Sequence, residues 1–173
     1  MERHLFREIS PLMLENAMQK IGKEWMLITT RDEKNHRVNA MTASWGTLGV
    51  LWGKDVCICF VRPQRHTYGL MEENERCSIA FLREEYRGAL RLCGSKSGRD
   101  SDKLSEAGLS SDELDGVPVI AEADTVLLCR KLYADDLKKA SFLDPALLSH
   151  YAAEDYHRFY VLEIEKVYRK ETE

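Results

Sequence analysis

The sequence predicts a single, mainly β domain, an antiparallel barrel with helical decoration. At least six β-prone apolar segments recur along its 173 residues, and most of them are joined by turns. This pattern suits an antiparallel barrel better than a doubly wound parallel sheet. No GxGxxG motif follows a predicted strand, so a dinucleotide-binding fold is not expected. No linker rich in Gly, Ser or Pro divides the chain, and we expect one domain over residues 1–173.

The first predicted element is a helix over residues 10–21. Ser10 is a good N-cap, Pro11 suits the first helical turn, and Gly22 can end the helix. Apolar residues recur between them at helical spacing.

Six strands are predicted after this helix. They cover residues 25–30, 38–44, 56–61, 76–82, 124–133 and 157–168. The polar stretch 31–37 is predicted to be a turn. Residues 46–53, which contain three glycines, are predicted to be a loop.

Shorter helices are expected between the later strands. One begins near Thr67 and passes Met71, and a second covers residues 85–93 and stops at Gly94. Asp100 could cap a third helix that ends near Gly108, and Asp144 followed by Pro145 opens a fourth.

Composition excludes several classes of protein. The net charge is −4 and the 25 basic residues are scattered, so the basic patch of a nucleic-acid-binding protein is not expected. No apolar run approaches the roughly 20 residues that cross a bilayer, and no membrane partner is expected. The charged start MERHLFREIS does not resemble a secretory signal, so we expect a cytoplasmic protein.

The cysteines do not predict a metal or disulfide site. The odd number, five, and the absence of a CxxC motif argue against both. Cys57 and Cys59 lie two residues apart in a predicted strand and share one face. The favoured interpretation is that the cysteines, including Cys77, Cys93 and Cys129, are small buried hydrophobes; a redox-active pair is the alternative.

The motif RPQRHT (62–67) predicts an anion site. Arg62, Arg65 and His66 precede a predicted helix start at Thr67, and a helix N-terminus offers free N–H groups and a positive dipole end. Arginine can hold a phosphate through two parallel bonds. The alternative is a solvated basic loop.

The motif NAMTASWG (39–46) alternates small and polar residues where a strand enters a loop. One face carries Ala40, Thr42 and Ser44, and the other carries Asn39, Met41 and Ala43. Small residues let a flat ligand approach the backbone, and Trp45 could flank it. The alternative is an ordinary barrel strand with Trp45 in the core.

The motif SKSGRDSDK (95–103) places glycine, serines and a lysine around a predicted helix start. Gly98 permits backbone shapes that point several N–H groups at one anion, and Lys103 could add a charge. The alternative is a solvated surface loop.

In this order, the three motifs resemble those of the flavin-reductase-like, flavoredoxin-type family of FMN-binding split barrels. The resemblance runs from about Trp25 to Tyr168 and includes MTASWGTLGVLWGKDVCICFVRPQRHTYGLMEENERCSIAFL, SGRDSDKLSEAGL, CRKLYADDL and DYHRFYVLEIEKVY. One departure is Leu104, where many relatives carry phenylalanine.

The resemblance implies a six-stranded antiparallel split β-barrel, usually a homodimer with FMN near the subunit interface. By position, Asn39 to Trp45 would line the isoalloxazine ring, through Asn39, Met41, Thr42, Ala43, Ser44 and Trp45. The phosphate end would be held by Arg62, Arg65, His66 and Thr67. The pocket would be closed by Ser97, Gly98, Asp100 and Lys103.

The expected function is that of an FMN-binding oxidoreductase: an NAD(P)H-dependent flavin reductase, or a flavoredoxin-like carrier reduced by another redox protein. The flavin carries the chemistry, so no catalytic acid or base and no metal is assigned. His157 is interpreted as structural, with proton donation or contact with the flavin of a dimer mate as alternatives. The alternatives for the whole chain are an FMN storage or sensor protein and a barrel that has lost flavin.

Overall fold

A computed structural model describes residues 6–171, so both ends of the predicted domain (1–5 and 172–173) lie outside the described residues. The main sheet has eight antiparallel strands, and seven of them follow the order β3-β2-β6-β9-β10-β5-β4, with β1 pairing to β10. Its members are β1 (Phe6–Ile9), β2 (Met26–Asp32), β3 (Arg37–Ala43), β4 (Gly46–Leu51), β5 (Lys54–Val61), β6 (Arg76–Phe81), β9 (Thr125–Asp136) and β10 (Arg158–Lys170).

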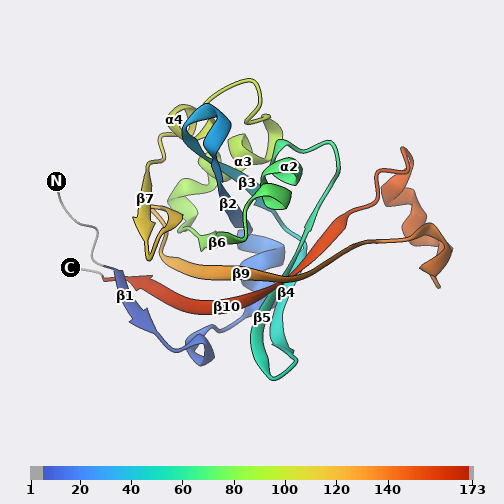
Figure 1. Ribbon diagram of the computed structural model, residues 1–173, viewed down its shortest axis with the longest axis horizontal. Coiled ribbons are helices and arrows are strands. Elements are labelled where there is room, and N and C mark those ends of the chain that lie inside the picture. The colour runs from blue at the N-terminus through green and yellow to red at the C-terminus, as the bar shows by residue number, and fades with distance from the viewer. Residues whose placement is uncertain (1–5, 172–173) are drawn as a thin grey trace.

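The sheet curls into a split barrel (Figure 1). Its two ends, β3 and β4, are consecutive in the chain and are joined at Ser44 and Trp45, yet no ladder pairs them within the described part of the chain. All six predicted strands are present, and the mainly β fold class is confirmed. Two strands that were not predicted, β1 and β4, extend the sheet.

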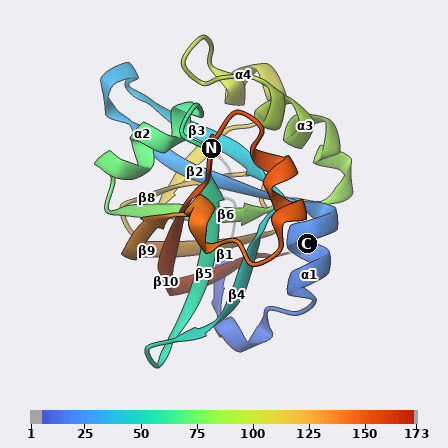
Figure 2. The ribbon, with the colours of Figure 1, turned by 90° about the vertical axis from the view of Figure 1, so that its right-hand side faces the viewer.

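Helices cover one side and the end of the barrel. They are α1 (Ala17–Gln19), α2 (His66–Glu73), α3 (Arg87–Ser95) and α4 (Lys103–Ala107). Figures 1 and 2 show α2, α3 and α4 together on the side of β2 and β3. The β4–β5 hairpin projects at the opposite side.

Side-chain alternation builds two cores. Met26 and Ile28 of β2 point into the barrel, whereas Leu27 lies in a second core outside it. On β9, Leu127 lies inside and Leu128 outside. The second core packs under α3, α4 and a separate hairpin of β7 (Ser111–Leu114) and β8 (Val117–Ile120).

All five cysteines are free and buried, as the favoured interpretation predicted. Cys57 and Cys59 both point into the barrel, together with Cys77 and Cys129. Burial raises the pKa of Cys57 and of Cys77 to about 12. These thiols therefore stay protonated at neutral pH and act as hydrophobic side chains.

The predicted helix over 10–21 is wrong. Ser10 caps only a 3-10 turn, Pro11–Met13, and Asn16 at φ 54° breaks the chain direction before α1. After α1 a π-helical turn, Lys20–Glu24, ends at Trp25 with φ 71° rather than at Gly22. The apolar spacing does not mark a core face, because Met18 is 91% exposed.

The glycine-bearing loop predicted over 46–53 is also wrong, since it forms β4 and the β4–β5 turn. Trp52 and Gly53 occupy the turn at φ 53° and 69°. Two positive φ values are typical of the tight turn that matches strand twist. Tryptophan is unusual there, so the turn carried no recognisable signal.

The β7–β8 hairpin was not predicted, although Asp115-Gly116 is a strong turn signal. Both residues have positive φ, 49° and 78°. We expect Gly116→Ala to lower the free energy of unfolding by about 1 kcal/mol, because an L-residue is strained there while the added methyl meets no neighbour. Urea denaturation measures this. Gly49→Ala, also in open space but without a positive φ, is the control; an equal loss in both variants would contradict the turn argument.

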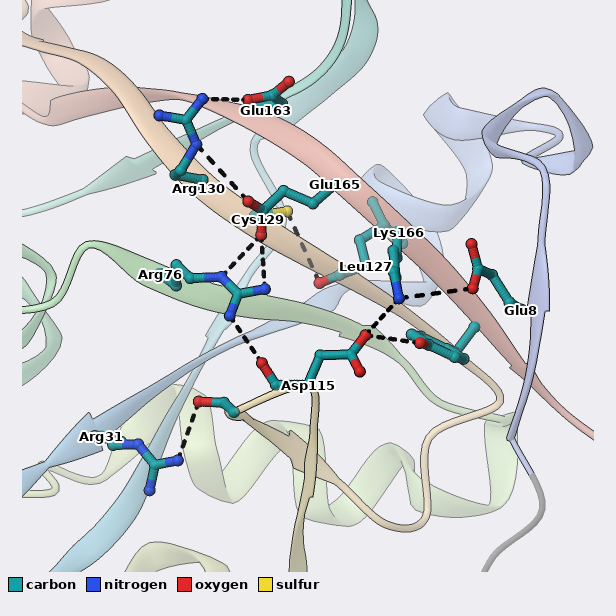
Figure 3. A network of polar contacts seen from close by, with 12 residues as sticks. Glu8, Arg31, Arg76, Asp115, Leu127, Cys129, Arg130, Glu163, Glu165 and Lys166 are labelled. Carbon is teal, nitrogen blue, oxygen red and sulfur yellow. Dashed lines mark hydrogen bonds and ion pairs between the residues drawn. The ribbon is translucent and has the colours of Figure 1, made fainter.

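A polar network holds this hairpin against the sheet (Figure 3). The Asp115 carboxylate accepts hydrogen bonds from Lys166 Nζ at 2.8 Å and Tyr168 Oη at 2.9 Å, which lower its pKa. Its carbonyl oxygen accepts from Arg76 at 2.8 Å, and Arg76 pairs with Glu165 at 2.7 Å. Each exposed ion pair contributes little to the free energy of unfolding, but together these contacts hold the β7–β8 hairpin over the second core.

One helix cap differs from the prediction, whereas the helix start predicted near Thr67 is confirmed. Asp102 caps α4, since its Oδ1 accepts from Ser105 N at 3.2 Å, whereas Asp100 lies exposed in the preceding loop. Asp100 therefore does not cap the helix. α2 begins at His66, with Thr67 as its second residue.

Residues 137–157, here called the arm, connect β9 to β10 and extend beyond the barrel (Figures 1 and 2). The arm contains 3-10 helices at Lys139–Ser141 and Pro145–Tyr151. Asp144 caps the second and Pro145 begins it, as predicted, although it is a 3-10 rather than an α-helix.

Candidate functional site

A cleft of about 230 Å³ lies where β3 and β5 end and β10 begins. It brings together parts of the first two motifs, which are far apart in the sequence. Its lining consists of Met41, Thr42, Ala43, Ser44, Trp45, Phe60, Arg62, Arg65 and His157.

The first motif forms one wall of the cleft. Thr42 is fixed from behind, because its hydroxyl donates to Leu90 O at 2.5 Å and its Cβ lies 3.3 Å from where a Cβ on Gly94 would be. Trp45 is 44% exposed and is therefore not a core residue. The small side chains Ala43 and Ser44 leave the backbone approachable between them.

Asn39 lies behind this wall rather than in it. Its side chain is buried and donates to Thr67 Oγ1 at 2.9 Å. A Cβ on Gly98 would lie 2.0 Å from Asn39 Oδ1 and 3.2 Å from His66 Cδ2. Residues of the three motifs are thus in direct contact, and Gly98 is required at this point.

The second motif divides into different roles. Arg62 pairs with Asp155 of the arm at 2.8 Å, donates to His150 O at 3.0 Å, and lies over the Tyr151 ring at 4.9 Å. This cation is therefore neutralised by the arm. Pro63 and Gln64 are exposed.

His66 faces a buried carboxylate. Its Nε2 lies 2.9 Å from Asp32 Oδ2, and Arg37 also approaches that carboxylate at 3.8 Å. Burial would raise the pKa of Asp32, but hydrogen bonds from Asn35 and His66 lower it. Asp32 is therefore an ionised partner that fixes His66 at the start of α2.

Arg65 and Lys103 form a pair of largely buried cations without an acidic partner in residues 6–171. Arg65 donates to the carbonyl oxygens of Gly94 at 3.0 Å and Cys93 at 3.3 Å, and Lys103 Nζ donates to Cys93 O at 3.2 Å. Burial, together with the charge of Arg65, lowers the pKa of Lys103 to about 8, against a smaller opposing effect of Cys93. Burial also lowers the pKa of Arg65.

No residue of the third motif, Lys103 included, belongs to the cleft lining; Lys103 lies behind it, beside Arg65. Ser97 and Asp100 belong to the loop between α3 and α4, where Asp100 N donates to Ser97 O at 3.3 Å. Gly98 is buried against the first two motifs, as described above.

His157 and Phe60 complete the cleft. His157 was interpreted as structural and Phe60 was not identified from the sequence, because an aromatic residue within a strand carries no binding signal. The His157 ring lies 5.3 Å from the Trp45 ring and 6.2 Å from the Phe60 ring. Burial and the charge of Arg62 lower the pKa of His157 to about 4, while Asp155 opposes this. The imidazole is therefore neutral at pH 7.

A larger cavity of about 370 Å³ lies at the other end of α3. Its floor contains Phe81 and Leu90, and its rim mixes cations with the carboxylates of Glu24, Glu84 and Asp124. It contains no residue of the three motifs. Its cations also lie among carboxylates, whereas Arg65 and Lys103 have no acidic partner in residues 6–171. We therefore regard the smaller cleft as the functional site.

Within residues 6–171, no three His, Cys, Asp or Glu side chains are grouped so that they could hold a metal ion. None of the helices in that range has the length and apolar character needed to span a membrane.

Comparison with known proteins extends these observations. A family model described as flavin reductase like domain matches residues 18–173. A comparison with curated protein sequences gave no significant match.

Solved structures show the same fold. An FMN-binding domain of a flavin reductases-like enzyme from Shewanella baltica OS155 is 16% identical, with a TM-score of 0.69 over 98% of this chain and 80% of its own. The FMN-binding protein of Thermus thermophilus, with bound p-hydroxybenzaldehyde, is 21% identical, with a TM-score of 0.67 over 94% and 81%. Flavoredoxin of Desulfovibrio vulgaris (Miyazaki F) is 18% identical, with a TM-score of 0.68 over 94% and 77%. The resemblance inferred from the three motifs is confirmed, and the chain belongs to the flavin reductase-like domain family.

Proposed function

We propose that the cleft binds FMN and that the protein is an FMN-dependent oxidoreductase, either a flavin reductase or a flavoredoxin-like electron carrier. The observation that carries FMN binding is the pair of cations, buried Lys103 and half-buried Arg65, which have no carboxylate partner among residues 6–171. Two like charges held together in a partly desolvated place favour an anion between or beside them. The description of the related Shewanella and Thermus proteins as FMN-binding supports the same ligand.

The chemistry of the donors fits a phosphate. Arg65 is also the N-cap of α2, and its side chain makes no capping hydrogen bond to the first turn of this helix. The α2 N-terminus therefore adds backbone N–H groups and a positive dipole end. The alternative is that both cations only neutralise the C-terminus of α3. However, the contacts described use one of three N–H donors on Lys103 and two of five on Arg65, so donors remain for a phosphate.

The wall formed by Met41 to Trp45 suits the flavin ring. A flat heterocycle can approach the backbone at Ala43 and Ser44, and Trp45 at the rim is exposed enough to flank it. Thr42, held by Leu90 O, keeps this wall in place. When bound, FMN supplies hydride and electron transfer, and the protein orients and tunes it.

FMN affinity is expected to fall as the pH rises above about 8. Lys103 has a pKa lowered to about 8 by burial and by Arg65, which the neighbouring Cys93 thiol opposes; burial raises the pKa of Cys93 itself. Its cationic form favours the phosphate, so affinity is highest below that pKa and decreases towards pH 10 as free Lys103 loses its proton. Calorimetry in two buffers of different ionisation enthalpy at pH 8.5 should detect proton uptake on FMN binding. Binding without proton uptake at that pH would contradict the role of Lys103.

The redox role has a direct test. The protein is purified, loaded with FMN and treated anaerobically with NADH and then with NADPH. Rapid bleaching with either donor supports the reductase. If neither nucleotide bleaches the flavin but a reduced redox protein added afterwards does, the carrier is supported. Slow reduction by all of these donors supports the storage alternative. If apo protein takes up no FMN, the proposal fails.

A homodimer is part of the proposal. Aromatic rings continue from the cleft along the outer side of β5, β9 and β10, and Trp52 and Tyr133 at the far end are 59% and 47% exposed. Partly exposed aromatic residues are enriched at protein interfaces. Light scattering of the wild type and of Trp52→Ser tests this; a monomeric wild type would overturn it.

A further inference from the structure

The arm places a phenol against the histidine of the cleft. Tyr151 Oη lies 2.7 Å from Nδ1 of His157, and both side chains are buried. The arm is held there by the Arg62–Asp155 ion pair and by the contact of His150 with Trp45, whose rings lie 5.3 Å apart. Tyr151 is therefore fixed relative to the cleft.

The direction of this hydrogen bond follows from the two groups. Burial raises the pKa of Tyr151, so the phenol keeps its proton, and His157 is neutral at pH 7. A phenol is the better donor and an imidazole nitrogen the better acceptor. Tyr151 therefore donates to Nδ1, which leaves the proton of the neutral ring on Nε2.

His157 Nε2 makes no hydrogen bond to any of residues 6–171, and its ring lines the cleft beside Trp45 and Phe60. The nearby charges of Arg62 and Asp155 cancel each other. The open side of the cleft thus offers aromatic surfaces and one neutral N–H donor. A neutral N–H donor beside the compensated Arg62–Asp155 pair favours an uncharged acceptor atom over an anion, because an anion bound there would give up hydration without gaining a counter-charge.

We propose that Tyr151 is a positioning residue that holds His157 as an Nε2–H donor, and that this pair selects flat, uncharged electron acceptors with a carbonyl-type oxygen, such as quinones. The inference rests on the proposed FMN function. In the reaction, a quinone takes up two electrons and two protons to become a hydroquinone as reduced FMN is oxidised. His157 supplies a hydrogen bond to the quinone oxygen and no net proton.

The first test needs no flavin. Nitrogen-15 NMR of the apo protein, with the His157 signals assigned by their loss in His157→Gln, is expected to show the Nε2–H tautomer from pH 5.5 to 8. In Tyr151→Phe we expect a mixture of tautomers. Tyr156→Phe is the control, because Tyr156 stacks on Tyr151 at 5.0 Å in the same arm. A wild-type ring protonated on Nδ1, or a tautomer unchanged in Tyr151→Phe, would overturn the positioning role.

The second test measures reoxidation of the reduced, FMN-loaded protein by menadione and by ferricyanide, an anion that needs no such hydrogen bond. Tyr151→Phe should slow the menadione reaction about tenfold, in line with one misplaced hydrogen bond, and leave the ferricyanide reaction unchanged. His157→Gln, which retains an N–H donor, should recover part of the rate that His157→Ala loses. Equal slowing with both acceptors would overturn the selection of quinones. Failure to bind FMN would instead overturn the proposed function, and the NMR result would still decide the positioning role.

Discussion

Lys103→Ala is expected to weaken FMN binding by about 10- to 100-fold while changing riboflavin binding little. The variant removes one charge-assisted hydrogen bond to the phosphate, a contact of about 1.5–3 kcal/mol. Riboflavin lacks the phosphate and depends on the ring wall at Met41 to Trp45. Quenching of flavin fluorescence gives both dissociation constants.

Two controls isolate the charge. Lys96→Ala removes a lysine from the same segment, but Lys96 is exposed and already paired with Glu106. Arg62→Ala removes a cation that lines the cleft but is paired with Asp155. Both should lower FMN affinity less than Lys103→Ala does. If Lys103→Ala weakened both ligands equally, Lys103 would support the fold and not the phosphate.

Gly98→Ala is expected to destabilise the protein by about 1–3 kcal/mol, the usual cost of overpacking, and to lower FMN affinity as well. The new methyl would lie 2.0 Å from Asn39 Oδ1, so Asn39 or the loop must move. Movement of Asn39 breaks its hydrogen bond to Thr67 at the start of α2. Thermal denaturation and FMN titration measure the two effects.

Gly88→Ala is the matched control for this substitution. Gly88 lies in α3 with no atom within 4 Å of an added Cβ, so alanine should stabilise the helix slightly. Wild-type stability and FMN affinity in Gly98→Ala would show that the contact between the three motifs is not needed.

The strands were predictable because their pattern is set locally. Each buried strand carries a run of β-branched or apolar residues, and alternation assigned Cys57 and Cys59 to one face correctly. The segment 10–21 was misread for a reason that is equally physical. Its helical spacing exists, but the left-handed Asn16 separates Leu14 from Ile21. Both therefore reach the core inside the barrel without a continuous helix, and Met18 is exposed.

The candidate site was predictable as a set of motifs but not as a set of roles. From the sequence alone, the same role at an anion site was expected of Arg62, Arg65 and His66. The fold gives two of them acidic partners, Asp155 from the arm and Asp32 from β2, which lie 93 and 34 residues away. Such pairings depend on tertiary structure. The same limit applies to Tyr151 and His157, whose contact is fixed by the path of the arm.

A crystal structure of the protein with FMN tests the central claim most directly. We expect phosphate oxygens within about 3 Å of Lys103 Nζ and the Arg65 guanidinium, a normal length for charged hydrogen bonds, and the flavin ring against Met41 to Trp45. A phosphate bound elsewhere with Lys103 and Arg65 unoccupied, or protein that takes up no FMN, would contradict it.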